Sequence, residues 1–176
     1  IHMKIDSKKG ILFWITGLSG SGKSTIANLI KEKIEKKYGP TIIMSGDDLR
    51  YITNFLKYKK KDRLEFAKTK LKYFKFITDQ KINLIFSTIS LFDSVRKDNR
   101  KIIKNYVEIF INADIGTIIK KNKKELNKKK KEKIWGVNIK PEFPKNPSIE
   151  IKNDLRVSTK KISKELLIEI NKFLKK

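Results

Sequence analysis

Short apolar runs separated by longer amphipathic segments dominate the pattern of this chain. The runs have the length of buried strands, and they are Ile11–Ile15, Thr41–Ser45, Ile82–Phe86, Tyr106–Ile111 and Ile149–Ile151. Between them, directly or after a loop, apolar residues recur at helical spacing. Strands that alternate with helices in this way build βαβ units and a parallel sheet. The pattern therefore predicts an α/β fold.

Helical spacing is clearest in segments that begin at Ser24, Asp62, Asp93 and Ser158, of which the last three are predicted to reach Lys81, Lys104 and Lys175. The predicted buried stripes are Ile26, Leu29, Ile30 and Ile34 in the first helix, Leu64, Ala67, Leu71, Phe74 and Thr78 in the second, and Ile162, Leu166, Ile170 and Phe173 in the last. The lysines of the second helix are predicted to lie mostly outside its stripe, and they are Lys68, Lys70, Lys72 and Lys75.

A complete phosphate-binding loop lies between the first strand and the first helix. Gly17, Gly22, Lys23 and Ser24 fill the pattern G-x-x-x-x-G-K-[ST]. Its glycines let the backbone approach an anion closely, and successive N–H groups with the positive end of the following helix then cradle phosphate. A Gly/Ser-rich turn without a ligand is the alternative. The strand before the loop, the helix after it and the complete motif favour the nucleotide site.

Each polar side chain of the loop has an expected task. Lys23 is expected to neutralise oxygens of the β- and γ-phosphates, and the Ser24 hydroxyl is expected to ligate Mg²⁺. The residues predicted to hold the nucleotide are Gly17, Ser19, Gly20, Ser21, Gly22, Lys23, Ser24 and Thr25.

Two further candidates follow the strand Thr41–Ser45. In an open parallel sheet the carboxyl ends of the strands face the ligand crevice, so Asp47 and Arg50 are expected beside the phosphate loop. A carboxylate near an acceptor hydroxyl supplies general-base assistance. The alternatives are a loop or helix-capping aspartate for Asp47, and a surface ion pair for Arg50.

The composition suits one domain with one substantial core, since the chain has 176 residues. It contains no Cys, which excludes disulfides and thiolate metal sites and suits a reducing cytoplasm. No apolar run is as long as a membrane-spanning helix, and the N-terminus lacks the apolar stretch of a signal peptide, so we expect a soluble, cytoplasmic protein without a membrane partner. Ile1-His2-Met3 is typical of a cloning remnant before a native Met3.

The formal net charge is +24, from 43 Lys and Arg against 19 Asp and Glu. Such a balance is found in nucleic-acid-binding proteins. Lys, however, heavily outnumbers Arg, and Ile and Asn are abundant, as a compositional bias of the source genome would produce. We interpret the charge as mainly solvated surface that attracts polyanionic nucleotides, and we expect no specific nucleic-acid partner.

The most basic segment, Ile115–Lys133, is helical in character. It is a solvated helix face, a lid helix that faces the nucleotide, or a nucleic-acid patch. The segment that follows, Ile134–Pro147, is irregular and rich in proline and aromatic residues, and long loops inside compact domains are usually functional. We therefore expect a single domain over residues 4–176 with a basic lid region at about residues 120–147.

Several blocks of the chain resemble the adenylylsulfate kinase family, which transfers the γ-phosphoryl group of ATP to the ribose 3′-hydroxyl of adenylyl sulfate. The blocks cover nearly the whole chain after Ile11 and occur in the family's order. They are Phe13–Thr25, Ser45–Arg50, Asp62-Arg63, Ile89-Ser90-x-Phe92 with Arg96, Lys124-x-Leu126, Gly136–Glu142, Pro144, Asn146 and Pro147.

The resemblance implies a P-loop kinase that has a five-stranded parallel sheet with helices on both faces, uses ATP and Mg²⁺, and forms a homodimer. It makes Lys23 and Asp47 catalytic, with Asp47 as the group that orients or deprotonates the acceptor hydroxyl, and it places Lys121 on the ATP side. Trp135 either stacks on a base or anchors the lid. The implied acceptor-binding residues are Asp47, Arg50, Arg63, Phe66, Ile89, Ser90, Arg96, Lys124 and Trp135.

Departures from the family pattern concentrate on the acceptor side. Ser45 and Asp48 stand where the family has Asp and Asn, Phe66 stands for Asn, and Asp93 stands for Arg. An arginine there suits an anionic sulfate, which an aspartate would repel. The blocks 88–96 and 140–147 resemble a diverged branch found with bacterial capsule genes, whose members resemble cytidine diphosphoramidate kinase.

Three functions follow from these observations. The first is a kinase for a nucleotide conjugate, with adenylyl sulfate as the family default, and the second is the same chemistry on a cytidine diphosphate conjugate. The third is a basic nucleic-acid-binding P-loop protein, which would bind with a steep salt dependence. The chain has no aromatic-interleaved basic sheet motif and no helix-turn-helix signal to support this third function.

Overall fold

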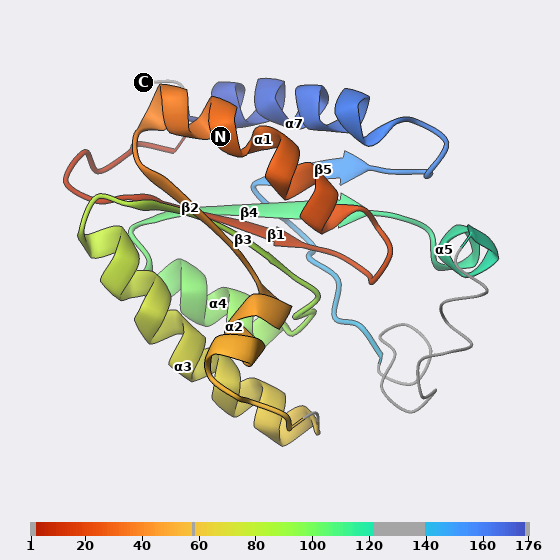
Figure 1. Ribbon diagram of the computed structural model, residues 1–176, viewed down its shortest axis with the longest axis horizontal. Coiled ribbons are helices and arrows are strands. Elements are labelled where there is room, and N and C mark those ends of the chain that lie inside the picture. The colour runs from red at the N-terminus through yellow and green to blue at the C-terminus, as the bar shows by residue number, and fades with distance from the viewer. Residues whose placement is uncertain (1–2, 58, 122–139, 175–176) are drawn as a thin grey trace.

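Parallel strands form the central sheet of the computed structural model, in the order β2-β3-β1-β4-β5 (Figure 1). The structure describes residues 3–57, 59–121 and 140–174. The predicted five-stranded parallel sheet is confirmed. Its strands are β1 (Ile11–Thr16), β2 (Thr41–Ser45), β3 (Asn83–Thr88), β4 (Asn105–Asn112) and β5 (Ile149–Lys152).

The central strand β1 is buried along its whole length, because it pairs with β3 on one side and β4 on the other. Its last residue, Thr16, lies opposite Thr88 of β3, and Ser45 at the end of β2 lies opposite Ser87. The hydroxyl-bearing carboxyl ends of three neighbouring strands therefore meet at one edge of the sheet.

Helices cover both faces of the sheet, as predicted (Figure 1). One face packs against α1 (Lys23–Tyr38) and α7 (Thr159–Phe173), and the other against α3 (Lys60–Asp79) and α4 (Asp93–Ile102). Two shorter helices, α2 (Gly46–Ile52) and α5 (Ile115–Lys121), follow the carboxyl ends of β2 and β4. None of the described helices is long and apolar enough to span a membrane.

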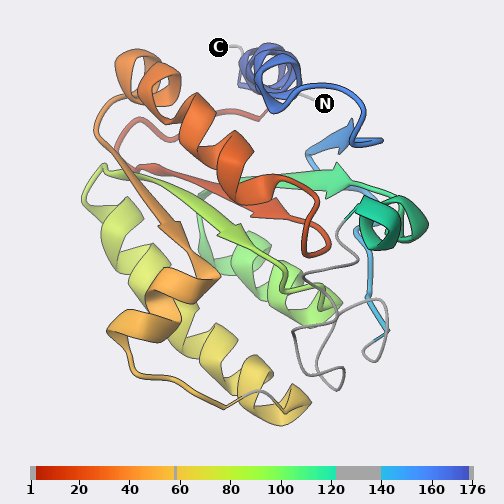
Figure 2. The ribbon, with the colours of Figure 1, turned by 45° about the vertical axis from the view of Figure 1, so that its right-hand side comes forward.

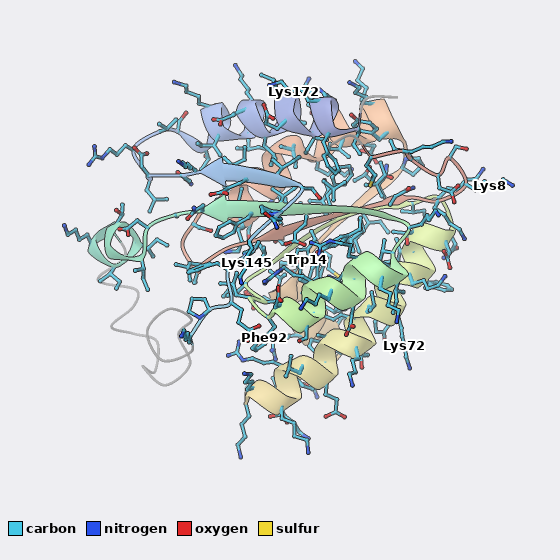
Figure 3. The ribbon with its side chains drawn as sticks, turned by 180° about the vertical axis from the view of Figure 1, so that it is seen from behind. Lys8, Trp14, Lys72, Phe92, Lys145 and Lys172 are labelled. Carbon is cyan, nitrogen blue, oxygen red and sulfur yellow. The ribbon has the colours of Figure 1, made fainter. Side chains whose placement is uncertain are left out.

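Each face of the sheet has its own apolar core. Aromatic rings fill the core under α3, where Trp14 stacks on Phe86 at 5.5 Å between ring centroids and meets the edge of Phe74 at 5.9 Å. In Figure 3, Trp14 lies between the sheet and the helices α3 and α4. Aliphatic residues, among them Ile26, fill the core under α1 and α7.

The structure corrects several details of the predicted helices. Leu29 is 38% exposed, so Ala27 takes its place in the buried stripe of α1. Lys70, predicted outside the stripe of α3, is only 6% exposed. The short helix α2 was not predicted. The described part of the basic helix ends at Lys121, and the remainder of the lid region up to residue 139 lies outside the described residues.

Candidate active site

The phosphate-binding loop joins β1 to α1 at the carboxyl edge of the sheet. Gly17, Gly20 and Gly22 all have positive φ angles, of 150°, 82° and 86°. At Gly17 the space is also closed, because a Cβ atom there would lie 2.5 Å from the carbonyl oxygen of Ile111 on β4. The glycines of the motif are therefore required by backbone conformation and by the close approach of the neighbouring strand.

Lys23, the first residue of α1, is buried and folds back over the loop. Its Nζ donates to the carbonyl oxygen of Leu18 at 2.6 Å and to Oγ of Ser21 at 3.4 Å. Burial lowers the pKa of Lys23 to about 8, and the carboxylate of Asp47 acts in the opposite direction. The ammonium thus lies over the anion-binding loop, within electrostatic reach of Asp47.

Ser24 reaches toward the end of β3, with 3.5 Å between its Oγ and that of Ser87. A hydroxyl at the mouth of a phosphate loop fits Mg²⁺, which usually takes few protein ligands and completes its shell with substrate phosphates and water. No group of three or more His, Cys, Asp or Glu residues among the described positions forms an all-protein metal site. This donor set is the one expected for a magnesium ion that arrives with a nucleotide.

Asn153, just after β5, supports the loop from behind. Its side chain is 2% exposed, and its Nδ2 donates to the carbonyl oxygen of Ser21 at 3.0 Å. Its own backbone N–H donates to Asn112 at the end of β4. The sequence motif ends at residue 25, so nothing in it pointed to a residue so much later in the chain.

Replacing Asn153 by Ala is expected to destabilise the loop, because the buried carbonyl of Ser21 would lose its partner. Such a loss costs about 1–3 kcal/mol of unfolding free energy. Urea unfolding measures this cost, and we expect the KM for ATP to rise with it. An unchanged KM for ATP in a destabilised N153A variant would show that Asn153 supports the fold without positioning the loop.

The helix α2 begins directly at the end of β2, on the side of the sheet covered by α3 (Figure 2). Its N-terminus is a reciprocal capping box, in which Ser45 Oγ accepts from the N–H of Asp48 at 3.1 Å and Asp48 Oδ2 accepts from the N–H of Ser45 at 2.7 Å. The two residues that depart from the family pattern in this block therefore cap the helix together.

Capping by Ser45 and Asp48 leaves Asp47 available for chemistry. The carboxylate of Asp47 is solvent-exposed, and no hydrogen bond or salt bridge engages it within the described ranges. It lies in the first turn of α2, where the helix dipole favours a negative charge, and its field reaches Lys23. Asp47 is therefore not the capping residue of α2, because Ser45 and Asp48 form the cap.

Arg50, one turn further along α2, organises the segment after that helix. Its Nη1 donates to the carbonyl oxygens of Phe55 and Lys57, both at 3.0 Å. Its guanidinium lies 5.2 Å from the ring centroid of Phe55 and 5.4 Å from that of Phe66. These two rings stack in parallel at 4.2 Å, so the structure brings together Arg50 and Phe66, two of the residues expected to bind the acceptor.

Arg96 on α4 lies in a different environment. It is 2% exposed, with Nη2 3.0 Å from Asp93 and Nε 3.4 Å from Glu108 of β4. Burial raises the pKa of Glu108, and the guanidinium groups of Arg100 and Arg96 oppose that shift. A guanidinium so enclosed has little surface for a ligand, so we propose a structural role for Arg96 in place of the predicted acceptor contact.

Asp93 begins α4 where the family has an arginine. A hydrogen bond from Lys97, with support from Arg96, holds the pKa of its carboxyl below the usual range. Its backbone N–H donates to Glu142 Oε2 at 2.7 Å, and the N–H of Glu142 donates to the carbonyl of Leu91. The charge of Asp93 is therefore neutralised within the protein, and the residue ties α4 to the segment that precedes β5.

The remaining predicted residues are placed as follows. Ile89 and Ser90 are half-buried just after β3, where the carbonyl of Ile89 accepts from the Thr16 hydroxyl at 2.9 Å. Arg63 is half-buried in the first turns of α3. Lys121 is the last residue of α5, whereas Lys124 and Trp135 lie outside the described residues. Sequence reasoning did not identify Ser87, Phe55 or Lys70 as residues near the site.

Comparisons with known proteins agree with this geometry. A cytidine diphosphoramidate kinase from Campylobacter jejuni is 36% identical over 164 residues, covering 89% of this chain and 96% of the relative. An adenylyl-sulfate kinase from Clostridium acetobutylicum is 33% identical, covering 84% and 77%. The structure of the Mycobacterium tuberculosis APS kinase in complex with AMPPNP and APS superimposes with a TM-score of 0.79 at 25% identity, covering 93% of this chain and 98% of that one.

A family model described as adenylylsulphate kinase matches residues 9–152, which include the phosphate loop, α2 and the start of α4. With a complete phosphate loop at the edge of a five-stranded parallel sheet, and with these relatives aligned over most of their length, the chain belongs to the adenylylsulphate kinase family of phosphotransferases.

Proposed function

We propose that this protein is a Mg·ATP-dependent kinase that transfers the γ-phosphoryl group to the ribose 3′-hydroxyl of a nucleotide conjugate. The observation that carries the proposal is the carboxylate of Asp47, exposed and unengaged by the described residues, within electrostatic reach of the buried Lys23. A free base beside a phosphate loop is the arrangement that phosphoryl transfer to a hydroxyl requires.

In the reaction we propose, the acceptor hydroxyl oxygen bonds to the γ-phosphorus of ATP as the bond from that phosphorus to the β–γ bridging oxygen breaks. ADP leaves, and the hydroxyl proton passes to Asp47. Lys23 would exchange its contacts with Leu18 and Ser21 for phosphate oxygens, so that its charge meets the charge that develops on the leaving group. The N–H groups of the loop would hold the β-phosphate.

The residues at the mouth of the loop support a magnesium ion bound together with ATP. Ser24 would supply the protein ligand, and the hydroxyl of Ser87, 3.5 Å from that of Ser24, would help to hold a water molecule of the ion. When bound, Mg²⁺ neutralises the charge on the β- and γ-phosphoryl oxygens.

Two acceptors are consistent with this site, adenylyl sulfate and cytidine diphosphoramidate. The charge of Asp93 does not separate them, because Lys97 and Arg96 neutralise it. The relationship to the Campylobacter jejuni kinase, at 36% identity over 96% of its length, favours the cytidine compound. Phe66, stacked on Phe55 where the family has an asparagine, agrees with an acceptor pocket that has changed.

Product identification tests the reaction class. Purified protein is incubated with Mg·ATP and each acceptor, and the products are followed by ³¹P spectra. We expect one new phosphomonoester on the ribose, coupled to the ribose 3′ proton, and none when EDTA removes the metal ion. Release of inorganic phosphate without a new ester would contradict the proposal, since the protein would then be an ATPase.

A further inference from the structure

A buried lysine of α3 lies over the same aromatic ring as Arg50 and has no acidic partner among the described residues. Lys70 of α3 is 6% exposed, and its ammonium lies over two aromatic rings, 5.3 Å from the centroid of Phe66 and 5.7 Å from that of Phe86. In the described part of the chain, no hydrogen bond or salt bridge engages its Nζ. Contact with ring faces recovers only part of the hydration that a buried ammonium loses.

Lys23 shows how unusual this is, because it and Lys70 are the lysines that are buried among the described residues. Lys23 has the carbonyl of Leu18 and the hydroxyl of Ser21 as partners. The negative charge of Asp47 also stabilises its ammonium. Lys70 has none of these. An enclosed cation without a counterion is typical of a site that receives an anion from outside the protein.

The charges around Lys70 are also positive. The guanidinium of Arg50 lies 5.4 Å from the centroid of the same Phe66 ring. Burial, followed by the charges of Arg50 and Arg63, lowers the pKa of Lys70 to about 8. Three cations from α2 and α3 therefore converge on one region, which we call the basic-aromatic cluster and define as Arg50, Phe55, Arg63, Phe66 and Lys70.

The basic-aromatic cluster adjoins the reaction centre. Phe86, under the Lys70 ammonium, directly precedes Ser87, whose hydroxyl is 3.5 Å from that of Ser24 in the phosphate loop. On its other side, Phe66 stacks on Phe55, whose carbonyl is held by Arg50. The cluster therefore includes Arg50 of α2, the helix that carries Asp47, and lies against β3, the strand whose Ser87 approaches the phosphate loop.

We propose that Lys70 binds an anionic group of the acceptor and, with Arg50 and Arg63, selects nucleotides that carry two linked acidic centres over nucleoside monophosphates. This inference rests on the proposed function, because it assigns the acceptor to this side of the site. Both candidate acceptors contain such an acid anhydride or diphosphate-type linkage, and two anionic centres match a group of three cations better than one does. Lys70 is a specificity residue in this scheme, and Asp47 and Lys23 perform the chemistry.

Lys70→Met tests the inference, because it removes the charge and keeps an apolar stem against the rings. Lys72→Met is the matched control, since Lys72 lies on the outer side of the same helix (Figure 3). Binding is measured by calorimetry with a non-hydrolysable ATP analogue filling the donor site, using cytidine diphosphate against cytidine monophosphate and adenylyl sulfate against adenosine monophosphate. Thermal unfolding of each variant reports its fold.

Wild-type protein is expected to prefer one of the two-centre ligands over its monophosphate. K70M is expected to bind that ligand about 10- to 100-fold more weakly, as for loss of a charge-assisted contact, and to lose most of the preference. Lys70→Arg, which keeps the charge, is expected to recover part of it, whereas K72M and the affinity for the ATP analogue stay at the wild-type level. The thermal midpoint of K70M is expected to rise at pH 7, because a buried charge has been removed.

The outcomes separate this inference from the proposed function. Unchanged acceptor binding and acceptor KM in K70M would overturn the role of Lys70 and leave the kinase activity standing. Lys70-dependent binding without turnover would overturn the proposed function and keep the anion site. Failure of wild-type protein to bind any of the four ligands would overturn both.

Discussion

Asp47→Asn is expected to lower kcat roughly 10²- to 10⁴-fold, the range typical of general-base assistance. The asparagine side chain keeps the size and hydrogen-bonding reach of the aspartate but does not accept a proton. The fold is expected to survive, because the cap of α2 is formed by Ser45 and Asp48 and needs nothing from Asp47. The KM for ATP is expected to change little, since the role proposed for Asp47 is on the acceptor.

Asp48→Asn is the matched control for this prediction. The same chemical change at the neighbouring residue leaves an amide oxygen that still accepts the N–H of Ser45, so it is expected to affect kcat little. Steady-state ADP release with saturating Mg·ATP and acceptor measures both variants. Turnover of D47N close to wild type, in a folded protein, would show that Asp47 is not the base.

Lys23→Met is expected to lower kcat/KM for ATP by roughly 10²- to 10³-fold, as for loss of one donor to developing charge. The Lys23 ammonium is the only one that the structure places over the phosphate loop among the described residues. Lys33→Met, on the exposed side of the same helix, is the control. Equal losses in K33M and K23M would mean that general positive charge on α1, and not a specific contact, attracts ATP.

The pH dependence of stability gives a second measurement on Lys23. Its pKa is about 8 in the folded protein and 10.5 when unperturbed, so between these values the unfolded chain holds a proton that the folded protein has released. The contribution of Lys23 to the free energy of unfolding therefore increases as the pH rises through that window. Below the window, the buried charge of Lys23 destabilises the folded protein. In urea unfolding, the stability of K23M relative to wild type is expected to be greatest near pH 7 and to decline toward pH 10. A difference that does not vary with pH would contradict this.

The parts of the site that local sequence determines were predicted from sequence. The phosphate loop needs only its own glycines, lysine and serine between a strand and a helix, and β1 and α1 flank it as expected. One topological rule, that the carboxyl ends of parallel strands meet at one edge, placed Asp47 near the loop, and its charge does act on Lys23. The residues involved are close together in sequence, so pattern alone sufficed.

The features that the sequence did not reveal depend on contacts between distant residues. Asn153, which follows the edge strand β5, donates a hydrogen bond to the carbonyl of Ser21, and no motif records a partner 132 residues away. Lys70 is buried with its ammonium over aromatic rings from α3 and β3, although its charge predicted a position in solvent. Arg96 is buried beside Asp93 and beside Glu108 of β4, a contact that its position in the sequence did not indicate.

The departures from the family pattern also gain a physical explanation only from the structure. Ser45 and Asp48 stand where the family pattern has Asp and Asn, and in the structure they exchange two hydrogen bonds and cap α2. Asp93 looked repulsive to an anionic acceptor, but Lys97 and Arg96 neutralise its charge. Among these departures, only Phe66 changes the surface proposed to meet the acceptor, since it belongs to the basic-aromatic cluster together with Phe55 and Arg50.

The proposed function is tested most directly by kcat/KM for cytidine diphosphoramidate and for adenylyl sulfate, measured as ADP release at saturating Mg·ATP. We predict release that depends on the acceptor and a higher kcat/KM for cytidine diphosphoramidate. A higher value for adenylyl sulfate would keep the kinase and reassign its acceptor. ADP release that is the same with and without either acceptor would contradict the proposal that this family member phosphorylates a nucleotide conjugate.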